Sequence, residues 1–513
     1  MDKKGFVYLI GAGPGDSGLF TLKGKRILEQ AEVVVYDRLV GEEILSLAHP
    51  DAEMIYVGKA SSQHALSQDG INALLLEKAA QGKKVARLKG GDPFLFGRGG
   101  EEALYLREHG YDYEVIPGIT SAIAVPAYAG IPVTHREATS SLAIVTGHEK
   151  PGKQESSIRW RELADGIGTL VFLMGVENLE YICENLMSEG KDGSTPVALI
   201  RWGTLPQQEV LTGTLDNIVA RVKEQSFKPP AVIVVGEVVK LRDQLNWLEK
   251  RPLWGKRVVV TRARAQASQL LNRIRDLGAQ AIEFPSITIE KEANLGPLYK
   301  ALQKIEEYNW IIFTSVNAVD IFFAEMQNEA KDIRDLKGIS IAAIGPATRE
   351  RLEKRGLRVD VLPEEYRAEG IIKELRPYIK AGQWILLPRA HGARAVLPET
   401  LRNWGAHVNE IFLYRAAAVN QVSQDTLNNI KNGELDYLTF TSSSTVSNFV
   451  KIIGAENVPG LKAKLKVACI GPVTAQTAVE HGFNVDIMAK EYTIDGLIKA
   501  IVADTGYEDM EVV

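Results

Sequence analysis

Two glycine-rich turns in the first half of the chain have the residue types of a ligand-binding loop. The first, Gly11-Ala12-Gly13-Pro14-Gly15-Asp16, follows the apolar run 6–10, and Asp37 comes about 20 residues later, as in dinucleotide-binding turns. The pattern departs at Asp16, because a carboxylate repels a pyrophosphate at a helix N-terminus. Pro14 also removes a backbone donor. We therefore expect a sharp turn beside a cationic or neutral ligand, not an NAD or FAD site.

The second glycine-rich loop runs from Arg87 to Glu102. Gly90 and Gly91 let the backbone approach a ligand, Asp92 supplies acceptors, and Glu101-Glu102 suits the first turn of a helix. Two more tight turns follow at 117–122 and 128–136. A purely structural turn after a strand is the alternative for any one of these loops.

Hydroxyl side chains dominate the candidate chemistry of the second half. Thr314-Ser315 with Asn317, and the run 441–445, each stand between a strand-like and a helix-like segment. Hydroxyls and free N–H groups at a helix start hold anions, although simple N-capping is the alternative. Residues 256–505 carry no metal-ligand cluster, phosphate loop or nucleophile–base pattern.

The elements that must position these groups alternate along the chain. Short β-branched runs, such as 33–36, 85–88 and 231–235, are separated by longer amphipathic stretches, which favours an α/β fold with largely parallel sheets. The 513 residues exceed the size of one hydrophobic core. Proline, glycine and charges interrupt the pattern near 246–255, so we expect domains at 1–246 and 256–513 with a linker at 247–255.

The second half repeats itself. Phe313-Thr314-Ser315 matches Phe440-Thr441-Ser442, 127 residues later (440 − 313), and Ile344-Gly345-Pro346 matches Ile470-Gly471-Pro472 at 126 (471 − 345). Because the matching segments keep nearly the same separation along the chain, we predict two similar α/β units from 256 to about 505.

Composition excludes several function classes. A net charge of -5 gives no basic field for nucleic acid or an anionic membrane. No apolar run reaches about 18 residues, so we expect no transmembrane helix. Cys183 and Cys469 have no metal-type spacing and read as two buried thiols in a reducing compartment. Without a secretory signal pattern, a cytoplasmic location is expected.

The first half resembles the uroporphyrinogen-III C-methyltransferase family. The matching segments cover residues 5–245 and include the turn 7–16, Tyr36-Asp37-Arg38-Leu39-Val40, the loop 90–102, 117–121, 127–136, 172–175, 201–204 and 228–231. The loop 90–102 is the most specific of them, because related corrin-ring methyltransferases share the glycine turns but usually not this whole loop.

The resemblance implies a two-subdomain methyltransferase fold that binds S-adenosylmethionine and forms a homodimer through this half. It places the proton acceptor at Asp37 and the donor at Lys59. Ala60 departs from the family's usual arginine and puts one substrate contact in doubt. The polycarboxylate substrate makes Arg38, His64, Arg98, His135 and Arg136 candidate partners. Cofactor contacts fall on Pro14, Gly90, Gly91, Asp92, Leu95, Thr120, Ser121, Met174, Gly203 and Ala231.

The second half resembles uroporphyrinogen-III synthase. This likeness rests on the order of weak motifs and on the duplication, and it implies two α/β lobes joined by a two-stranded connection, with the first and last segments in one lobe. Tyr414 falls at the family's best catalytic position, with packing as the alternative role. Candidate substrate contacts are Thr261, Ser315, Ser442, Ser443 and Thr474.

The two resemblances support each other, because the synthase product is the methyltransferase substrate. The expected protein closes hydroxymethylbilane with ring inversion and loss of water. It then methylates uroporphyrinogen III twice to precorrin-2, on a route to siroheme or cobalamin. No metal cofactor, nucleic acid or membrane partner is expected. Two alternatives remain: a methyltransferase acting on a later corrin intermediate, and a second half that only binds or regulates.

Overall fold

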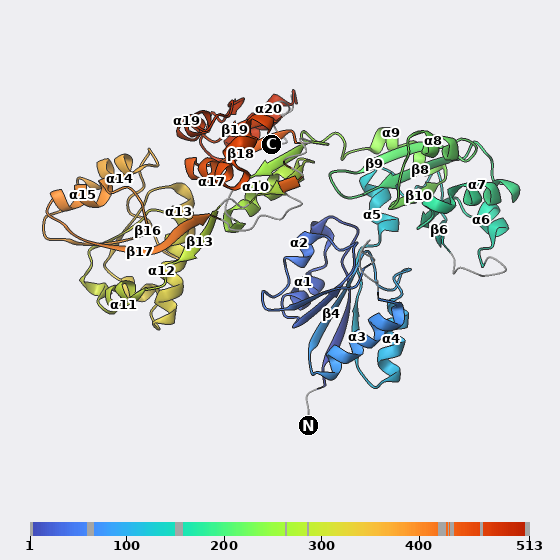
Figure 1. The fold of residues 1–513 in the computed structure, drawn as a ribbon, viewed down its shortest axis with the longest axis horizontal. Coiled ribbons are helices and arrows are strands. Elements are labelled where there is room, and N and C mark those ends of the chain that lie inside the picture. Colours follow the sequence, from blue (N-terminus) through green and yellow to red (C-terminus); the bar gives the residue numbers. More distant parts are fainter. Residues whose placement is uncertain are drawn as a thin grey trace. The chain divides into compact units, whose positions relative to one another are not determined.

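The computed structural model divides the chain into two compact units. Figure 1 shows their helices and strands, coloured along the sequence. It describes residues 4–58, 66–148, 157–261, 264–284, 287–418, 427–428, 430, 435–461 and 465–507. The first unit comprises Met1–Arg257 with Ile274–Gln280 and Thr505–Val513, and the second comprises Val258–Arg273 with Ala281–Asp504. Each unit contains two five-stranded sheets.

The first sheet of unit 1 is parallel throughout, with strand order β3-β2-β4-β1-β5. Strand β1 is buried on both faces, since Val7 and Leu9 pack into one core and Ile10 into another, which explains its continuous apolar sequence. The carboxyl ends of all five strands meet at one edge, where α/β proteins bind ligands. The elements are β1 (Phe6–Gly11), α1 (Leu22–Leu28), β2 (Val33–Tyr36), α2 (Glu42–Leu45), β3 (Glu53–Tyr56), α3 (Gln68–Ala80), β4 (Lys84–Lys89), α4 (Gly99–Glu108) and β5 (Tyr113–Ile116).

The second sheet of unit 1 corrects the expectation of largely parallel sheets. In the order β6-β7-β10-β8-β9, only β6 and β7 run parallel, and the other three pairs are antiparallel. The short segment 202–208 joins β8 to β9, and so short a connection suits only antiparallel neighbours. The elements are α5 (Ser121–Tyr128), β6 (Leu142–Thr146), α6 (Trp160–Gly166), β7 (Thr169–Leu173), α7 (Leu179–Ser188), β8 (Pro196–Arg201), β9 (Glu209–Thr214), α8 (Ile218–Glu224), β10 (Ala231–Val235) and α9 (Arg242–Leu245).

One lobe of unit 2 is built from the two ends of its sequence. Its sheet has the order β12-β11-β18-β19-β20, so the first two strands lie in the same sheet as the last three. The expected sharing of one lobe by the first and last segments is confirmed. The elements are β11 (Arg257–Val260), α10 (Arg264–Asp276), β12 (Gln280–Glu283), β18 (Tyr437–Phe440), α17 (Ser443–Ile453), α18 (Val458–Leu461), β19 (Lys466–Cys469), α19 (Pro472–Glu480), β20 (Ile487–Met488) and α20 (Ile494–Asp504).

The intervening residues form the other lobe, with sheet order β13-β17-β16-β14-β15. Strands β13 and β17, which lead into and out of this lobe, pair antiparallel and supply the expected two-stranded connection. The elements are β13 (Ile287–Lys291), α11 (Gly296–Gln303), β14 (Trp310–Phe313), α12 (Val316–Asn328), β15 (Ser340–Ala343), α13 (Pro346–Glu353), α14 (Ala368–Leu375), β16 (Trp384–Ala390), α15 (Val396–Asn403) and β17 (His407–Ala418).

The sequence repeat is a structural repeat. Strand β14 with helix α12 corresponds to β18 with α17, and β15 with α13 corresponds to β19 with α19. The starts of α13 and α19 lie 126 residues apart (472 − 346), the offset seen in the sequence. The two lobes are therefore copies of one α/β unit, as predicted.

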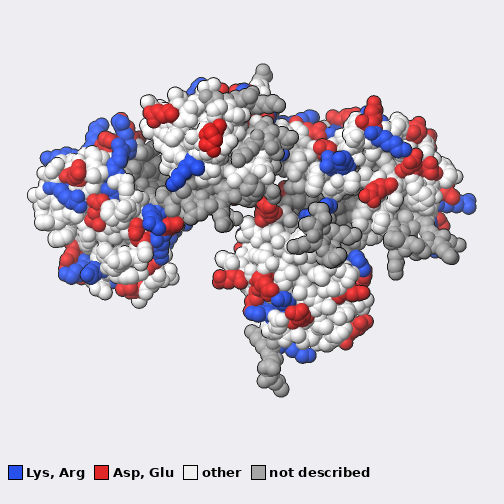
Figure 2. All heavy atoms as spheres, in the orientation of Figure 1, with Lys and Arg blue, Asp and Glu red and all other residues white. Residues whose placement is uncertain are grey.

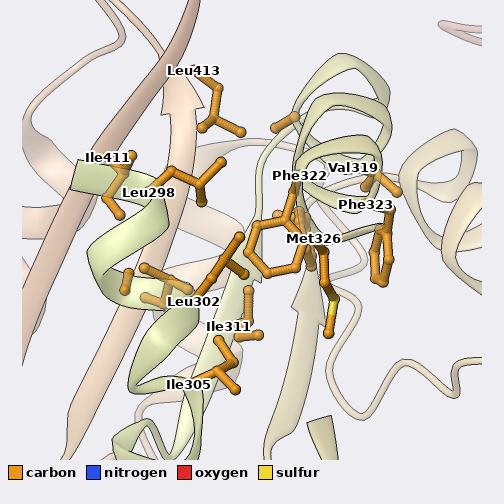
Figure 3. Packing of buried hydrophobic residues seen from close by; sticks show 14 of the residues in the cluster. Leu298, Leu302, Ile305, Ile311, Val319, Phe322, Phe323, Met326, Ile411 and Leu413 are labelled. Carbon is orange, nitrogen blue, oxygen red and sulfur yellow. The ribbon is translucent and has the colours of Figure 1, made fainter. Parts of the chain in front are cut away.

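The core beneath α11 and α12 fixes the start of α12, where a candidate hydroxyl lies. Leu298 and Leu302 of α11 face Phe322 and Met326 of α12 across the sheet residue Ile311 (Figure 3). Fully buried aromatic side chains of this size contribute strongly to lobe stability, about 1.5–3 kcal/mol each. The helix is thus anchored along its length.

The surface charges and the state of the two cysteines can be compared with what the composition predicts. On the face drawn in Figure 2, basic and acidic side chains are interspersed over the described part of the chain. Among the described helices, none has the length and apolarity to cross a membrane. Cys183 and Cys469 are free and buried, as predicted, and burial raises the pKa of each thiol to about 12.

Candidate active sites

The carboxyl ends of β1, β4 and β5 approach so closely that only glycine fits. Gly13 and Gly91 pair as a two-residue bridge, with the Gly91 N–H 2.7 Å from the Gly13 carbonyl and the reverse bond at 3.1 Å. A Cβ on Gly118 would lie 2.2 Å from the Gly91 carbonyl oxygen, and one on Gly11 would lie 2.5 Å from the Gly118 Cα. Gly118 belongs to the turn singled out in the sequence, but its close approach was not foreseen.

Asp92 holds this loop in shape. Its Oδ1 accepts from the backbone N–H groups of Phe94 and Leu95 at 2.8 and 3.1 Å, and Oδ2 accepts from Gly118 N–H at 3.0 Å. The carboxylate therefore joins the end of β4 to the loop after β5. Pro14, Gly90 and Leu95 line the same loops and are half-buried.

Asp16, which breaks the dinucleotide pattern, ties the first turn to later segments. Its Oδ1 accepts from Gly18 N–H at 2.8 Å, and Oδ2 accepts from the Tyr128 hydroxyl at 2.7 Å. The Asp16 N–H donates to Thr204 Oγ1 at 3.1 Å. Burial and the Asp16 hydrogen bond raise the pKa of Tyr128, so its hydroxyl remains a donor. The carboxylate thus has a structural role that the sequence pattern alone did not show.

Strained backbone marks the other loops that carry predicted cofactor contacts. Of the seven non-glycine residues with positive φ in the described chain, Met174, Trp202 and Thr204 lie in these loops, and two more lie in the loop 90–102. Such strain concentrates at functional sites. Met174 has φ +59° and is 53% exposed, while Gly203 lies between Trp202 (φ +49°) and Thr204 (φ +71°). A Cβ on Gly203 would lie 2.3 Å from the Val125 side chain.

The remaining predicted cofactor contacts lie at element starts. Thr120 caps α5, because its Oγ1 accepts from Ala122 N–H at 3.2 Å, and Ser121 is the first residue of that helix. Ala231 opens β10 and is half-buried. Thr120 and Ser121 also lie directly beside Gly91, where a Cβ would stand 3.9 Å from the Ser121 nitrogen.

Asp37 lies just past the end of β2, with both carboxylate oxygens engaged. Oδ1 accepts from Leu39 N–H at 3.1 Å, and Oδ2 accepts from Arg87 Nη2 at 3.4 Å, while the side chain stays 27% exposed. It is therefore held in one orientation yet open to solvent. Lys59 and His64 lie outside the described residues.

A buried ionic network behind Asp37 was missed in the sequence. Arg87 and Lys89 of β4 and Glu102 of α4 are all buried, and Glu102 Oε1 accepts from Arg87 Nε at 3.2 Å and from Lys89 Nζ at 2.7 Å. Burial, together with repulsion from Arg87, lowers the pKa of Lys89. Glu102 had been assigned to an ordinary first helical turn. The sequence did offer one indication of this network, because Arg87 and Lys89 are charged residues at alternate positions of an otherwise apolar strand.

The predicted anion partners differ in their surroundings. Arg98, in the left-handed region at φ +58°, pairs with Glu101, and that hydrogen bond raises its pKa. His135 Nδ1 accepts from Glu137 N–H at 3.3 Å. Arg38 and Arg136 are exposed.

In unit 2 the structure brings together two predicted residues that lie far apart in sequence. Tyr414 of β17 and Ser315, the N-cap of α12, share a hydrogen bond of 2.8 Å between their hydroxyls. Ser315 Oγ also accepts from Ala318 N–H at 3.1 Å. Tyr414 is only 6% exposed. The tyrosine hydroxyl is thus positioned by a helix cap.

The equivalent residues of the other lobe form a different set of bonds. Ser442 caps α17 in a reciprocal arrangement with Thr445, and its Oγ lies 3.0 Å from Ser444 Oγ. Ser443 Oγ accepts from Thr477 Oγ1 at 2.9 Å. Thr474 is buried in α19, and Thr261 is buried with its hydroxyl donating to the Thr439 carbonyl at 2.7 Å. Thr261 thereby joins β11 to β18.

Known proteins match each unit separately and the chain as a whole. A family model described as tetrapyrrole (corrin/porphyrin) methylases matches residues 7–219, and one described as uroporphyrinogen-III synthase HemD matches residues 268–499. The porphyrin biosynthesis protein HemD of Ruminiclostridium josui is 39% identical over 97% of this chain and 98% of that protein. The uroporphyrinogen-III C-methyltransferase of Bacillus subtilis (strain 168) is 46% identical over 70% of this chain and 74% of its own length.

Among the solved structures that are similar to part of the chain is a methyltransferase. The uroporphyrin-III C-methyltransferase of Thermus thermophilus, complexed with S-adenosyl homocysteine, shares 41% identity, covering 46% of this chain and 99% of that chain with a TM-score of 0.40.

These matches define a fusion of a tetrapyrrole methylase region with a uroporphyrinogen-III synthase region. The chain belongs to the family of the porphyrin biosynthesis protein HemD, and it is an enzyme with both regions.

Proposed function

We propose that the chain makes uroporphyrinogen III from hydroxymethylbilane in unit 2 and methylates it twice in unit 1 to give precorrin-2. The methyltransferase relatives and the glycine-built site of unit 1 support the first-unit activity. The Ser315–Tyr414 pair supports the second. The observation that carries the proposal is the carboxyl edge of the first sheet, where Gly13 pairs with Gly91 and where Leu39 and Arg87 orient Asp37.

The residues of unit 1 fit S-adenosylmethionine. The site offers backbone, hydroxyl and thioether groups, and the close packing of Gly11, Gly91 and Gly118 fixes the backbone of the loops that carry them. The donor supplies an electrophilic methyl group when bound. We propose that Pro14, Gly90, Gly91, Asp92, Leu95, Thr120, Ser121, Met174, Gly203 and Ala231 hold it.

Asp37 would act as the proton acceptor in methyl transfer. The attacked ring carbon must lose a proton after it gains the methyl group, and a positioned carboxylate accelerates such a step. Asp37 suits this role because its orientation is fixed by Leu39 and Arg87 while part of it remains exposed. Lys59 would be the donor. Arg38, His64, Arg98, His135 and Arg136 would hold substrate carboxylates.

Tyr414 would assist departure of the hydroxyl group of hydroxymethylbilane. Its hydroxyl can donate a proton or hydrogen bond to the leaving oxygen while Ser315 fixes its direction. Ser442 and Ser443, with Thr261 and Thr474, would orient carboxylates from the other lobe through hydroxyls and helix-start N–H groups.

Mass spectrometry of the product from hydroxymethylbilane and S-adenosylmethionine tests both activities on the full chain. We expect uroporphyrinogen III without the methyl donor and a gain of two methyl groups with it. Appearance of only the uninverted ring isomer would reject the synthase activity and favour a binding or regulatory unit. Failure to methylate supplied uroporphyrinogen III would reject the methyltransferase assignment and favour a later corrin substrate.

We also propose a homodimer formed through unit 1 and a cytoplasmic location. The family resemblance implies the dimer, and the two free thiols suit a reducing compartment such as the cytoplasm. Light scattering on the full chain should give twice the 56.4 kDa mass of one copy.

A further inference from the structure

A buried ionic network lies in the first sheet of unit 1. We define it as Arg87, Lys89, Glu102 and Asp37. Arg87 and Lys89 alternate with Leu88 on β4 and are 3% and 5% exposed, and Glu102 is 0% exposed. Removing one ion of a buried set leaves the others uncompensated, so such groups are found where they are paired.

Within the network, Glu102 is a shared acceptor. Its Oε1 accepts from Arg87, from Lys89 and from Gln68 Nε2 at 3.3 Å, whereas Oε2 has no hydrogen-bond partner among the described residues. One carboxylate therefore faces two cations. The second negative charge that balances the network is Asp37.

Arg87 is the only member of the network that bonds to both carboxylates in the described chain. Nε donates to Glu102, Nη2 donates to Asp37, and Nη1 donates to the carbonyls of Leu88 at 2.8 Å and Val35 at 3.4 Å. Four bonds fix the guanidinium plane, since its donors form a rigid fork. The strand register explains the reach, because Val35 of β2 lies opposite Arg87 and Tyr36 lies opposite Leu88.

We propose that Arg87 is a positioning residue that orients the Asp37 carboxylate for proton removal during methyl transfer. This inference rests on the proposed role of Asp37. Glu102 and Lys89 set the position of Arg87 from behind, and Leu39 N–H holds the other oxygen of Asp37. The network thus transmits the rigidity of the sheet to a side chain that is partly exposed.

The test is a double-mutant cycle on the full chain with Arg87→Lys and Asp37→Asn. Lysine keeps the charge but cannot hold both carboxylates in one plane. We expect Arg87→Lys to lower kcat of methyl transfer by about 10- to 100-fold through misorientation. The KM for uroporphyrinogen III, the Kd for S-adenosylhomocysteine and the cyclisation rate should change by less than about twofold. In the Asp37→Asn background the same substitution should lower kcat by less than about threefold.

A matched control is Arg107→Lys, which alters an exposed arginine of the neighbouring helix α4 that pairs with Asp112. It should leave every parameter unchanged. If Arg87→Lys does not fold, the double variant R87Q/E102Q, which removes one charge of each sign, takes its place with the same expectations.

The outcomes separate the inference from the proposed function. Equal losses of kcat from Arg87→Lys in both backgrounds would show a merely structural role and overturn the inference. Full activity of Asp37→Asn alone would overturn the role of Asp37 and, with it, this inference. A loss seen only as weaker S-adenosylhomocysteine binding would likewise overturn it.

Discussion

The two units of the chain orient their reactive groups by different means. In unit 1 a partly exposed carboxylate, Asp37, is held by a buried arginine that belongs to an ionic network. In unit 2 a buried tyrosine hydroxyl is held by a helix-capping serine, and no ion takes part in that bond. The difference matches the proposed chemistry, because removal of a proton calls for an oriented base whereas departure of water calls for a neutral donor.

Both units nevertheless bury a carboxylate on a helix. Glu102 lies in the first turn of α4 and Glu325 in the last turn of α12. Glu325 accepts from Lys291, from Tyr299 at 2.6 Å and from Asn328 at 3.3 Å. Only the network of Glu102 reaches a proposed proton acceptor. A buried charge is therefore informative about function through what it touches rather than through its burial.

The largest effect is expected from replacing Asp37, the proposed proton acceptor of unit 1. Asp37→Asn should lower kcat of methyl transfer by at least about 100-fold, because an amide cannot accept the proton. Transfer of labelled methyl from S-adenosylmethionine measures this rate. Cyclisation by the same preparation should be unchanged. A loss in both reactions would show that the substitution disturbs more than one unit.

In unit 2, loss of the Tyr414 hydroxyl should lower the rate of cyclisation by less than loss of the Asp37 carboxylate lowers the rate of methyl transfer. Tyr414→Phe keeps the ring and removes the hydroxyl, and cyclisation should fall by about 10- to 100-fold. The measurement is the initial rate of uroporphyrinogen III formation from hydroxymethylbilane. Methyl transfer to supplied uroporphyrinogen III serves as the internal control. An unchanged cyclisation rate would assign Tyr414 to packing.

The internal repeat offers a matched pair for the helix caps. Ser315→Ala and Ser442→Ala each remove an N-cap, and each should cost about 1 kcal/mol of unfolding free energy in urea. Ser315→Ala should additionally lower kcat of cyclisation, because Ser315 alone of the two holds Tyr414, whereas Ser442→Ala should act mainly on the KM for hydroxymethylbilane. Equal kcat values in the two variants would contradict that asymmetry.

The smallest effect concerns the buried carboxylate of unit 2. Hydrogen bonds from Lys291 and Tyr299 lower the pKa of Glu325 below its ordinary value of 4.5. Its stabilisation is therefore present above about pH 4.5 and is lost as the pH falls through the lower value in the folded state. Glu325→Gln should destabilise the chain by about 1–2 kcal/mol at pH 7, and less at pH 3.5. Urea unfolding at both pH values checks this; a constant difference would contradict it.

Local patterns predicted much of the fold and the positions of the sites. The glycine turns, the β-branched runs and the duplicated segments are set by neighbouring residues, and Ser315 and Ser442 cap helices as their place in the sequence suggests. The antiparallel strand pairs in the second sheet of unit 1 were not predicted. Apolar runs such as Val197–Ile200 show burial but carry no strand direction.

Features that depend on tertiary contact were beyond the reach of local patterns. Glu102 has the position of a solvated residue in a first helical turn, and only the packing of α4 against β4 buries it beside Arg87. Gly118 similarly becomes indispensable only where three strand ends meet. Such contacts join residues whose separation along the chain gives no periodic signal.

The interleaved course of the chain through unit 2 bears on its synthesis by the ribosome. The sheet containing β13 to β17 has all its strands once residue 418 has emerged, whereas β11 and β12 must wait for β18, β19 and β20. The lobe that contains β13 to β17 can therefore fold while β11 of the other lobe still lacks its neighbour β18, and that strand edge is open to other chains. Premature termination after residue 418 would release a product with one finished lobe and one exposed pair of strands.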